Sequence, residues 1–140
     1  MNRRRLLIGA APAVAAMALW PAIASLPWRG AQAASSPARR LAGTLRNPAS
    51  AARVGLAYLQ QHPAEAHLAR LLEGLVGEWH DAGGWLDRVG PGELRSRLRE
   101  QIRADFAARR TVRVHGWVLA QSEARLFALA ALVEGGVTAC

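Results

Sequence analysis

The sequence predicts a mainly α fold, a small helical domain of about four helices with one short β-hairpin, preceded by an N-terminal export signal. Apolar residues recur at helical spacing over most of the chain after residue 47, and one short segment alternates like a strand. At the N-terminus, arginines are followed by an apolar run, a pattern typical of export signals. These patterns divide the chain into a signal (1–33), a flexible leader (34–46) and one helical domain (47–140).

The start of the chain resembles a twin-arginine (Tat) export motif, in which a polar residue and two arginines precede two apolar residues. Asn2 fills the polar place, and the residues of the motif proper are Arg3, Arg4, Leu6 and Leu7. An apolar run over residues 6–26 follows. It is only moderately hydrophobic, which favours the twin-arginine route over the general secretory one. The resemblance implies recognition by the Tat translocase and a periplasmic location.

A small-x-small sequence of the kind that signal peptidase cuts ends the signal at Ala31-Gln32-Ala33, so we expect cleavage after Ala33. Ala22-Ile23-Ala24 is a second candidate. The alternative is an uncleaved inner-membrane anchor, because about 20 apolar residues can span a bilayer. Pro12 and Pro21 disfavour one continuous helix there, and a mitochondrial presequence would be amphipathic. We expect contact with the membrane only through this segment, if it is not cleaved.

The leader, residues 34–46, is small and polar and shows no apolar periodicity, so we expect it to be flexible. A first helix is expected from Asn47-Pro48 to about Gln60, with Asn47 as its cap. Pro63 opens a second helix. The apolar residues on one face of it are expected to pack in the core: Leu68, Leu71, Leu72, Leu75, Val76 and Trp79. Glycines at 83–84 and 90–92 then predict a loop around Trp85, Leu86 and Val89.

A third helix is expected over residues 93–107, with a stripe at successive i+4 steps and arginines 95, 99 and 103 on its solvated outer face. The stripe consists of Leu94, Leu98, Ile102 and Phe106. Residues 111–114 and 117–119 read as two strands joined by a tight turn at His115-Gly116. Ser122 is expected to cap a final helix that ends at Gly135-Gly136, with these residues buried: Leu126, Phe127, Leu129, Ala130 and Val133.

The charge of the chain is strongly positive but unevenly placed. All 18 cationic side chains are arginine and the formal net charge is +8. Eight arginines precede the first acidic residue, Glu65, and from there ten arginines accompany ten carboxylates. The excess therefore lies in the signal and the leader, and export argues against nucleic acid as a partner. The single cysteine, Cys140, permits no intramolecular disulfide.

Motifs for catalysis or cofactor binding do not stand out. His62, His67, His80 and His115 form no i, i+4 pair, and the chain has no paired cysteines, phosphate-binding loop or Gly-x-Ser-x-Gly elbow. We therefore expect no catalytic residue, no cofactor and no metal. If one pair acts, it is His80 with Asp81 beside the glycine loop, as a base or a ligand.

Residues 102–106, 116–119 and 122–126 resemble a recurring C-terminal signature of small uncharacterised periplasmic proteins that carry a twin-arginine signal. The resemblance implies a shared fold and transfers no functional residue. By its signal and size the chain is also similar to the small subunit of gluconate-type membrane dehydrogenases.

Three hypotheses for function follow. The first is a non-catalytic accessory or small subunit that binds a larger periplasmic enzyme, with a redox enzyme as one candidate, through Trp85 and Trp117 as interface anchors. Both tryptophans could instead pack in the core. The second is an autonomous ligand-binding or enzymatic domain that uses His80 and Asp81. The third is a binder of anionic membrane surfaces through the arginines of the acid-free segment: Arg39, Arg40, Arg46 and Arg53.

Overall fold

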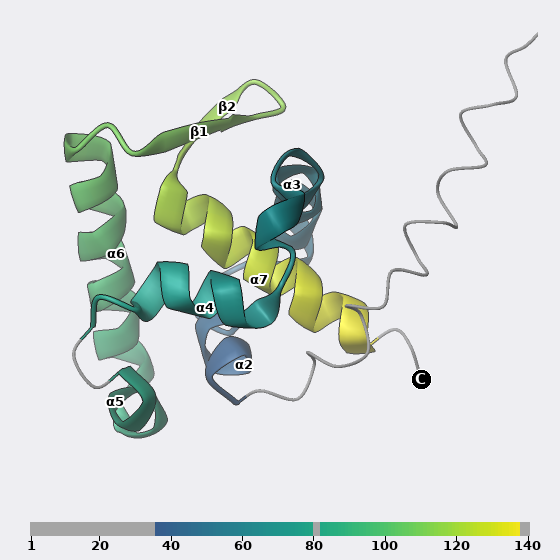
Figure 1. The fold of residues 1–140 in the computed structure, drawn as a ribbon. Coiled ribbons are helices and arrows are strands. Elements are labelled where there is room, and N and C mark those ends of the chain that lie inside the picture. The colour runs from purple at the N-terminus through teal and green to yellow at the C-terminus, as the bar shows by residue number, and fades with distance from the viewer. Residues whose placement is uncertain (1–35, 80–81, 138–140) are drawn as a thin grey trace, which may run out of the picture.

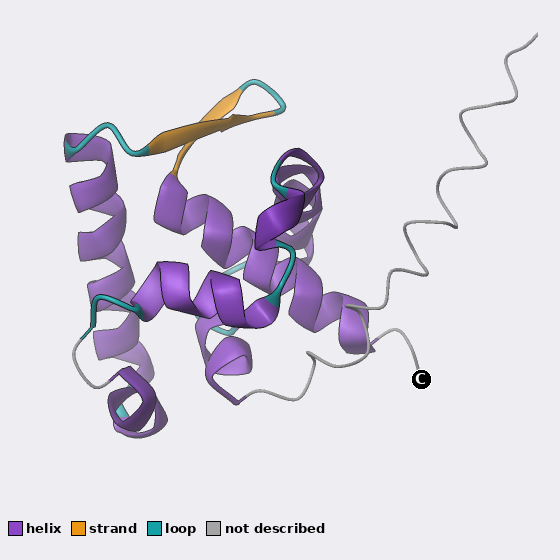
Figure 2. Ribbon diagram, in the orientation of Figure 1, coloured by secondary structure: helices purple, strands orange, loops and turns teal. Residues whose placement is uncertain are grey.

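The computed structural model describes residues 36–79 and 82–137 of the 140-residue chain. Within these ranges lie six α-helices, one short 3₁₀ helix and one antiparallel β-hairpin (Figures 1 and 2). The elements are α2 (Ser36–Ala42), α3 (Pro48–Gln61), η2 (Pro63–Glu65), α4 (Leu68–Val76), α5 (Ala82–Arg88), α6 (Pro91–Ala107), β1 (Thr111–Val114), β2 (Trp117–Ala120) and α7 (Gln121–Val137). The prediction of a mainly α fold with one hairpin is confirmed.

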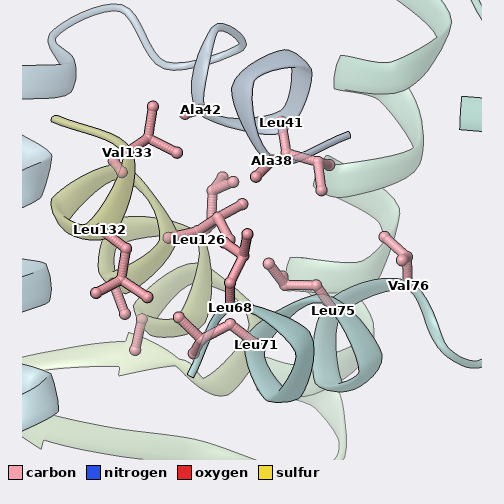
Figure 3. Close-up of a cluster of buried hydrophobic side chains, with 14 of the residues drawn as sticks. Ala38, Leu41, Ala42, Leu68, Leu71, Leu75, Val76, Leu126, Leu132 and Val133 are labelled. Carbon is pink, nitrogen blue, oxygen red and sulfur yellow. The ribbon is translucent and has the colours of Figure 1, made fainter. Parts of the chain in front are cut away.

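Helix α7 runs through the middle of the molecule, and α2, α3, α4, α6 and the hairpin all contact it (Figure 1). Residues 128–133 are buried without a break. Because successive helical residues point about 100° apart, an unbroken buried run means that the helix is covered on all sides. In Figure 3, side chains of α2, α4 and α7 meet in one apolar cluster that includes Leu41, Leu75 and Leu126.

Helix α3 makes the most extensive contact with α7. As predicted, Asn47 caps it, because the Asn47 side chain accepts a hydrogen bond from the Ser50 N–H at 3.1 Å. The two helices approach so closely at Gly55 that a Cβ atom there would lie 2.0 Å from the carbonyl oxygen of Phe127. Only glycine fits this crossing without moving the backbone.

The expectation of a flexible leader is wrong for residues 36–42, which form helix α2. Pro37 suits the first turn of a helix, and Ala38, Leu41 and Ala42 follow at the i, i+3, i+4 spacing of a single face. All three are buried. Their burial against α7 explains how a helix too short to be stable alone is held.

The expected loop around Trp85 is helix α5 instead. Leu86 and Val89 are buried, and the guanidinium of Arg40 donates hydrogen bonds to the carbonyl oxygens of both residues. Carbonyls at the end of a helix lack partners within the helix, so Arg40 supplies the donors that the end of α5 needs. Trp79, expected on the stripe of the second helix, is buried just beyond the end of α4. That helix begins at Leu68, since residues 63–65 form η2.

The predicted apolar stripe of α6 is wrong at its last residue, Phe106. Leu94 and Leu98 are buried, but Phe106 is 46% exposed while its neighbour Asp105 is only 3% exposed. Each i+4 step turns about 40° beyond a full circle, so four residues in strict i+4 steps drift around the helix. Residues 94, 98, 101 and 105, which alternate steps of four and three, stay on the inner face.

The hairpin has the predicted register, with Val114 opposite Trp117 and Thr111 opposite Ala120. His115 and Gly116 have φ values of +48° and +83°. A type I′ two-residue turn, which matches the twist of the strands, needs a positive φ at both positions. Helix α7 begins at Gln121, directly after β2, and continues past the expected stop at Gly135-Gly136 to Val137.

In the part of the chain that the structure describes, no helix is long and apolar enough to cross a membrane. The expected signal motif, the cleavage site at Ala31 and Ala33, and Cys140 lie outside the described residues.

The crossing of α3 and α7 generates a stability prediction. Gly55→Ala is expected to lower the free energy of unfolding by at least about 1–3 kcal/mol, because the added methyl group overlaps the Phe127 carbonyl. Gly92→Ala is the matched control, since a Cβ atom there meets nothing within 4 Å. Urea unfolding followed by circular dichroism measures both variants. Equal stabilities would show that the two helices do not pack as described.

Candidate functional site

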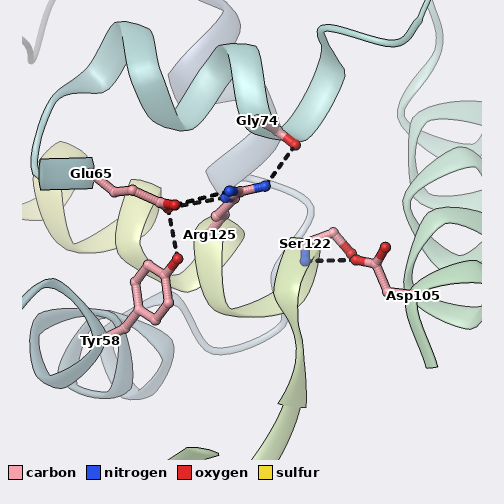
Figure 4. Close-up of polar contacts among 6 residues, drawn as sticks. All are labelled: Tyr58, Glu65, Gly74, Asp105, Ser122 and Arg125. Carbon is pink, nitrogen blue, oxygen red and sulfur yellow. Dashed lines mark hydrogen bonds and ion pairs between the residues drawn. The ribbon is translucent and has the colours of Figure 1, made fainter. Parts of the chain in front are cut away.

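A polar cluster of three side chains lies between α3, η2, α4 and α7 (Figure 4). The Arg125 guanidinium donates to both carboxylate oxygens of Glu65, from Nη2 to Oε1 at 2.9 Å and from Nε to Oε2 at 3.0 Å. Its Nη1 reaches the carbonyl oxygen of Gly74 at 3.3 Å. The Tyr58 hydroxyl donates to Glu65 Oε2 at 2.6 Å. The cluster therefore joins four elements at one half-buried ion pair.

The ionisable groups of this cluster shift the pKa values of one another. The hydrogen bonds from Arg125 lower the pKa of Glu65 below its ordinary value, against the effect of burial, and the same bonds raise the pKa of Arg125. Burial and the adjoining carboxylate raise the pKa of the Tyr58 hydroxyl. The carboxylate thus stays ionised and the phenol stays neutral at physiological pH. Each group meets the hydrogen-bonding requirement of its neighbour, as expected of a cluster that stabilises the fold.

A second polar cluster fixes the hairpin. The buried Asp105 carboxylate accepts the backbone N–H of Ser122 at Oδ2 and the Arg110 Nε–H at Oδ1, both at 2.8 Å. Burial alone raises the pKa of Asp105, but the hydrogen bonds from Ser122 and Arg110 outweigh it, and the pKa is lowered. Ser122 does not cap α7 through its own side chain as expected. Asp105, from the end of α6, receives an N–H group of the first turn of α7 instead (Figure 4).

The turn end of the hairpin, residues 114–118, presents apolar side chains to water. Trp117 is 71% exposed and Val118 is 49% exposed. Their side chains point to opposite faces of the hairpin, because successive residues of a strand alternate. In Figure 1 the hairpin lies along one end of the molecule, with its turn directed away from α6. We call this exposed end, with Trp117 and Val118, the hairpin tip.

The two tryptophans expected as interface anchors lie in different surroundings. Trp117 is exposed at the hairpin tip, whereas Trp85 is half-buried against the core. The ring of Trp85 meets Trp79 edge to face, with 5.4 Å between centroids, and the Arg97 guanidinium lies 5.7 Å from the Trp79 ring. These groups border a hollow of about 340 Å³. Of these two tryptophans, Trp117 therefore has more surface available to a partner.

Among the described residues, the other predicted site residues do not form a cluster. His80 and Asp81 lie outside the described residues. His62 stacks against Tyr58 at 4.5 Å between centroids, while His67 and His115 are exposed elsewhere. Arg40, expected to face anionic lipid, is occupied by the end of α5. Within residues 36–79 and 82–137, no three His, Cys, Asp or Glu side chains are grouped so that they could hold a metal ion.

The ion pair of Glu65 with Arg125 generates a pH prediction. A folded-state pKa below the ordinary glutamate value adds stability that is fully present above that value, about 4.3, and is lost as pH falls through the folded-state pKa. Glu65→Gln is expected to cost about 1–3 kcal/mol at pH 7 and progressively less toward pH 3. Glu73→Gln, on the exposed face of α4, is the control. Denaturant midpoints at each pH measure the difference, and a cost that does not shrink in acid would contradict the assignment.

Comparison of the chain with models of known protein families, with curated proteins and with solved structures found no match.

Proposed function

We propose that this chain is an exported, non-catalytic accessory subunit that binds a larger periplasmic enzyme through the hairpin tip. The observation that carries the proposal is the exposure of Trp117, 71% of which faces water on a firmly held hairpin. Tryptophan is among the residues that contribute most to binding energy at protein interfaces, because it buries a large surface at a small entropic cost.

The contrast between Trp117 and the residues that hold the fold together supports a role in binding over a role in folding. Asp105 and Arg125 join elements of the fold through hydrogen bonds, and Gly116 has the positive φ that the turn needs. Trp117, by contrast, keeps most of its surface in water. The hairpin is anchored at its other end by Asp105, so the tip is presented in one orientation and loses little freedom on binding.

The kind of partner follows from the expected export route. Twin-arginine export carries cargo that folds or assembles before it crosses the membrane, so a small subunit can travel with a larger enzyme or lend it a signal. A redox enzyme is one candidate, by analogy with the small subunit of gluconate-type membrane dehydrogenases. The expected signal at Arg3 and Arg4 thus belongs to the same proposal as the hairpin tip.

The test is affinity purification of the tagged, natively expressed protein from periplasm, followed by mass spectrometry of everything retained. The wild-type chain is expected to retain a larger enzyme in stoichiometric amount. Trp117→Ala is expected to reduce that retention by about 30-fold, the loss that a truncated interface anchor of about 2 kcal/mol causes.

Phe106→Ala is the matched control, because Phe106 is an exposed aromatic residue on α6 and not on the hairpin tip. It is expected to retain the partner, and both variants are expected to melt at the temperature of the wild type. Recovery of the wild-type chain alone would refute the accessory role. Equal loss in both variants would refute the assignment to the hairpin tip.

A further inference from the structure

We propose that a second surface, independent of the accessory role, binds a small amphipathic anion: an alkyl body with a phosphate or carboxylate headgroup. The site is a groove of about 520 Å³ between the segment 44–46 and helix α6, with α7 beneath it. We call it the arginine groove. Its volume lies within the range of small-molecule pockets in proteins, about 300–1,000 Å³.

The base of the arginine groove is apolar. Leu98 of α6 and Leu126 of α7 are buried at its floor, and Leu45 and Ile102 are half-buried beside them. The two half-buried side chains keep apolar surface in contact with water. An alkyl chain laid on this surface would remove it from water, which is favourable in proportion to the area covered.

The rim of the groove is cationic. Arg46 comes from the loop between α2 and α3, and Arg95 and Arg99 come from successive turns of α6. Among the described residues that line the groove, none is acidic. Glu100 of the same helix pairs with Arg97 at 3.8 Å and does not line the groove. The field of the rim is therefore uncompensated by the residues that border it.

The rim arginines also retain donors for a ligand. Arg95 Nε donates to the carbonyl oxygen of Pro91 at 3.2 Å, and Arg99 Nη2 donates to Ser96 Oγ at 3.5 Å. Each bond uses one of the five N–H donors of a guanidinium. Arg95 and Arg99 stand four residues apart on one helix, an arrangement in which like charges repel. An anion between them would relieve that repulsion.

The guanidinium groups of the rim and the apolar floor of the arginine groove together indicate the class of ligand. The planar guanidinium of arginine can donate two parallel hydrogen bonds to two oxygens of a carboxylate or phosphate. Several guanidinium groups can bind one headgroup. The floor favours a ligand that also carries an apolar body over a bare anion. Free amphiphiles and anionic lipids share this chemistry, so the headgroup and the alkyl body define the proposal.

Calorimetric titration of the full chain with octyl phosphate, below its micelle concentration and at low salt, tests the site. Octyl phosphate is expected to bind more tightly than inorganic phosphate and more tightly than octanol. The double variant Arg95→Gln/Arg99→Gln is expected to bind it at least about tenfold more weakly, because two charge-assisted contacts are lost.

The control is Arg103→Gln/Arg113→Gln, which removes the same charge from exposed positions outside the groove and is expected to bind like the wild type. Equal binding of octanol, equal binding of inorganic phosphate, equal loss in the control, or no binding would each overturn the proposal. Circular dichroism establishes that the variants fold.

Sedimentation with phosphatidylglycerol vesicles then identifies the source of the anion. Loss of sedimentation in the groove variant but not in the control assigns the site to a lipid headgroup. Octyl phosphate binding without vesicle binding assigns it to a free amphiphile. Because neither readout uses a protein partner, failure here leaves the accessory role standing, and failure of the accessory role leaves this site standing.

Discussion

The close crossing of α3 over α7 at Gly55 is the constraint on which the rest of the structure depends. It brings the backbone of α3 against that of α7 at Phe127 and Ala128, and the remaining faces of α7 are then covered by α2, α4, α6 and the hairpin (Figure 1). The alanine-rich middle of α7 suits this position, because small side chains allow neighbours to approach from several sides. A single buried helix thereby organises a domain of modest size.

Two polar clusters then tie distant parts of the chain to the same helix. Arg125 holds η2 and α4 through Glu65 and the Gly74 carbonyl, and Asp105 joins the end of α6 to the start of α7 beside the hairpin. Both carboxylates have a lowered pKa, because the hydrogen bonds that they accept favour the ionised form. The polar side chains of both clusters are therefore occupied by contacts within the fold.

Sequence patterns predicted those elements whose signals are local. The cap at Asn47, the apolar stripe of α4 and the turn at His115-Gly116 each depend on a few neighbouring residues. The missed features depend on residues far apart in the chain. Helix α5 needs Arg40, some 46 and 49 positions before the carbonyls that it contacts, and the Glu65–Arg125 pair spans 60 positions. The arginine groove was missed for the same reason, because α6 alone shows its arginines only as a solvated face. An alternating step of four and three along α6 would have identified residue 105 as inward-facing.

Site-specific photo-crosslinking in cells shows most directly whether Trp117 touches another protein. A photoreactive amino acid in place of Trp117 is compared with one in place of Arg103, an exposed position on α6. We expect an adduct much heavier than the 15.0 kDa chain from position 117 and none of that size from position 103. Absence of an adduct from position 117, or the same adduct from both positions, would contradict binding through the hairpin tip.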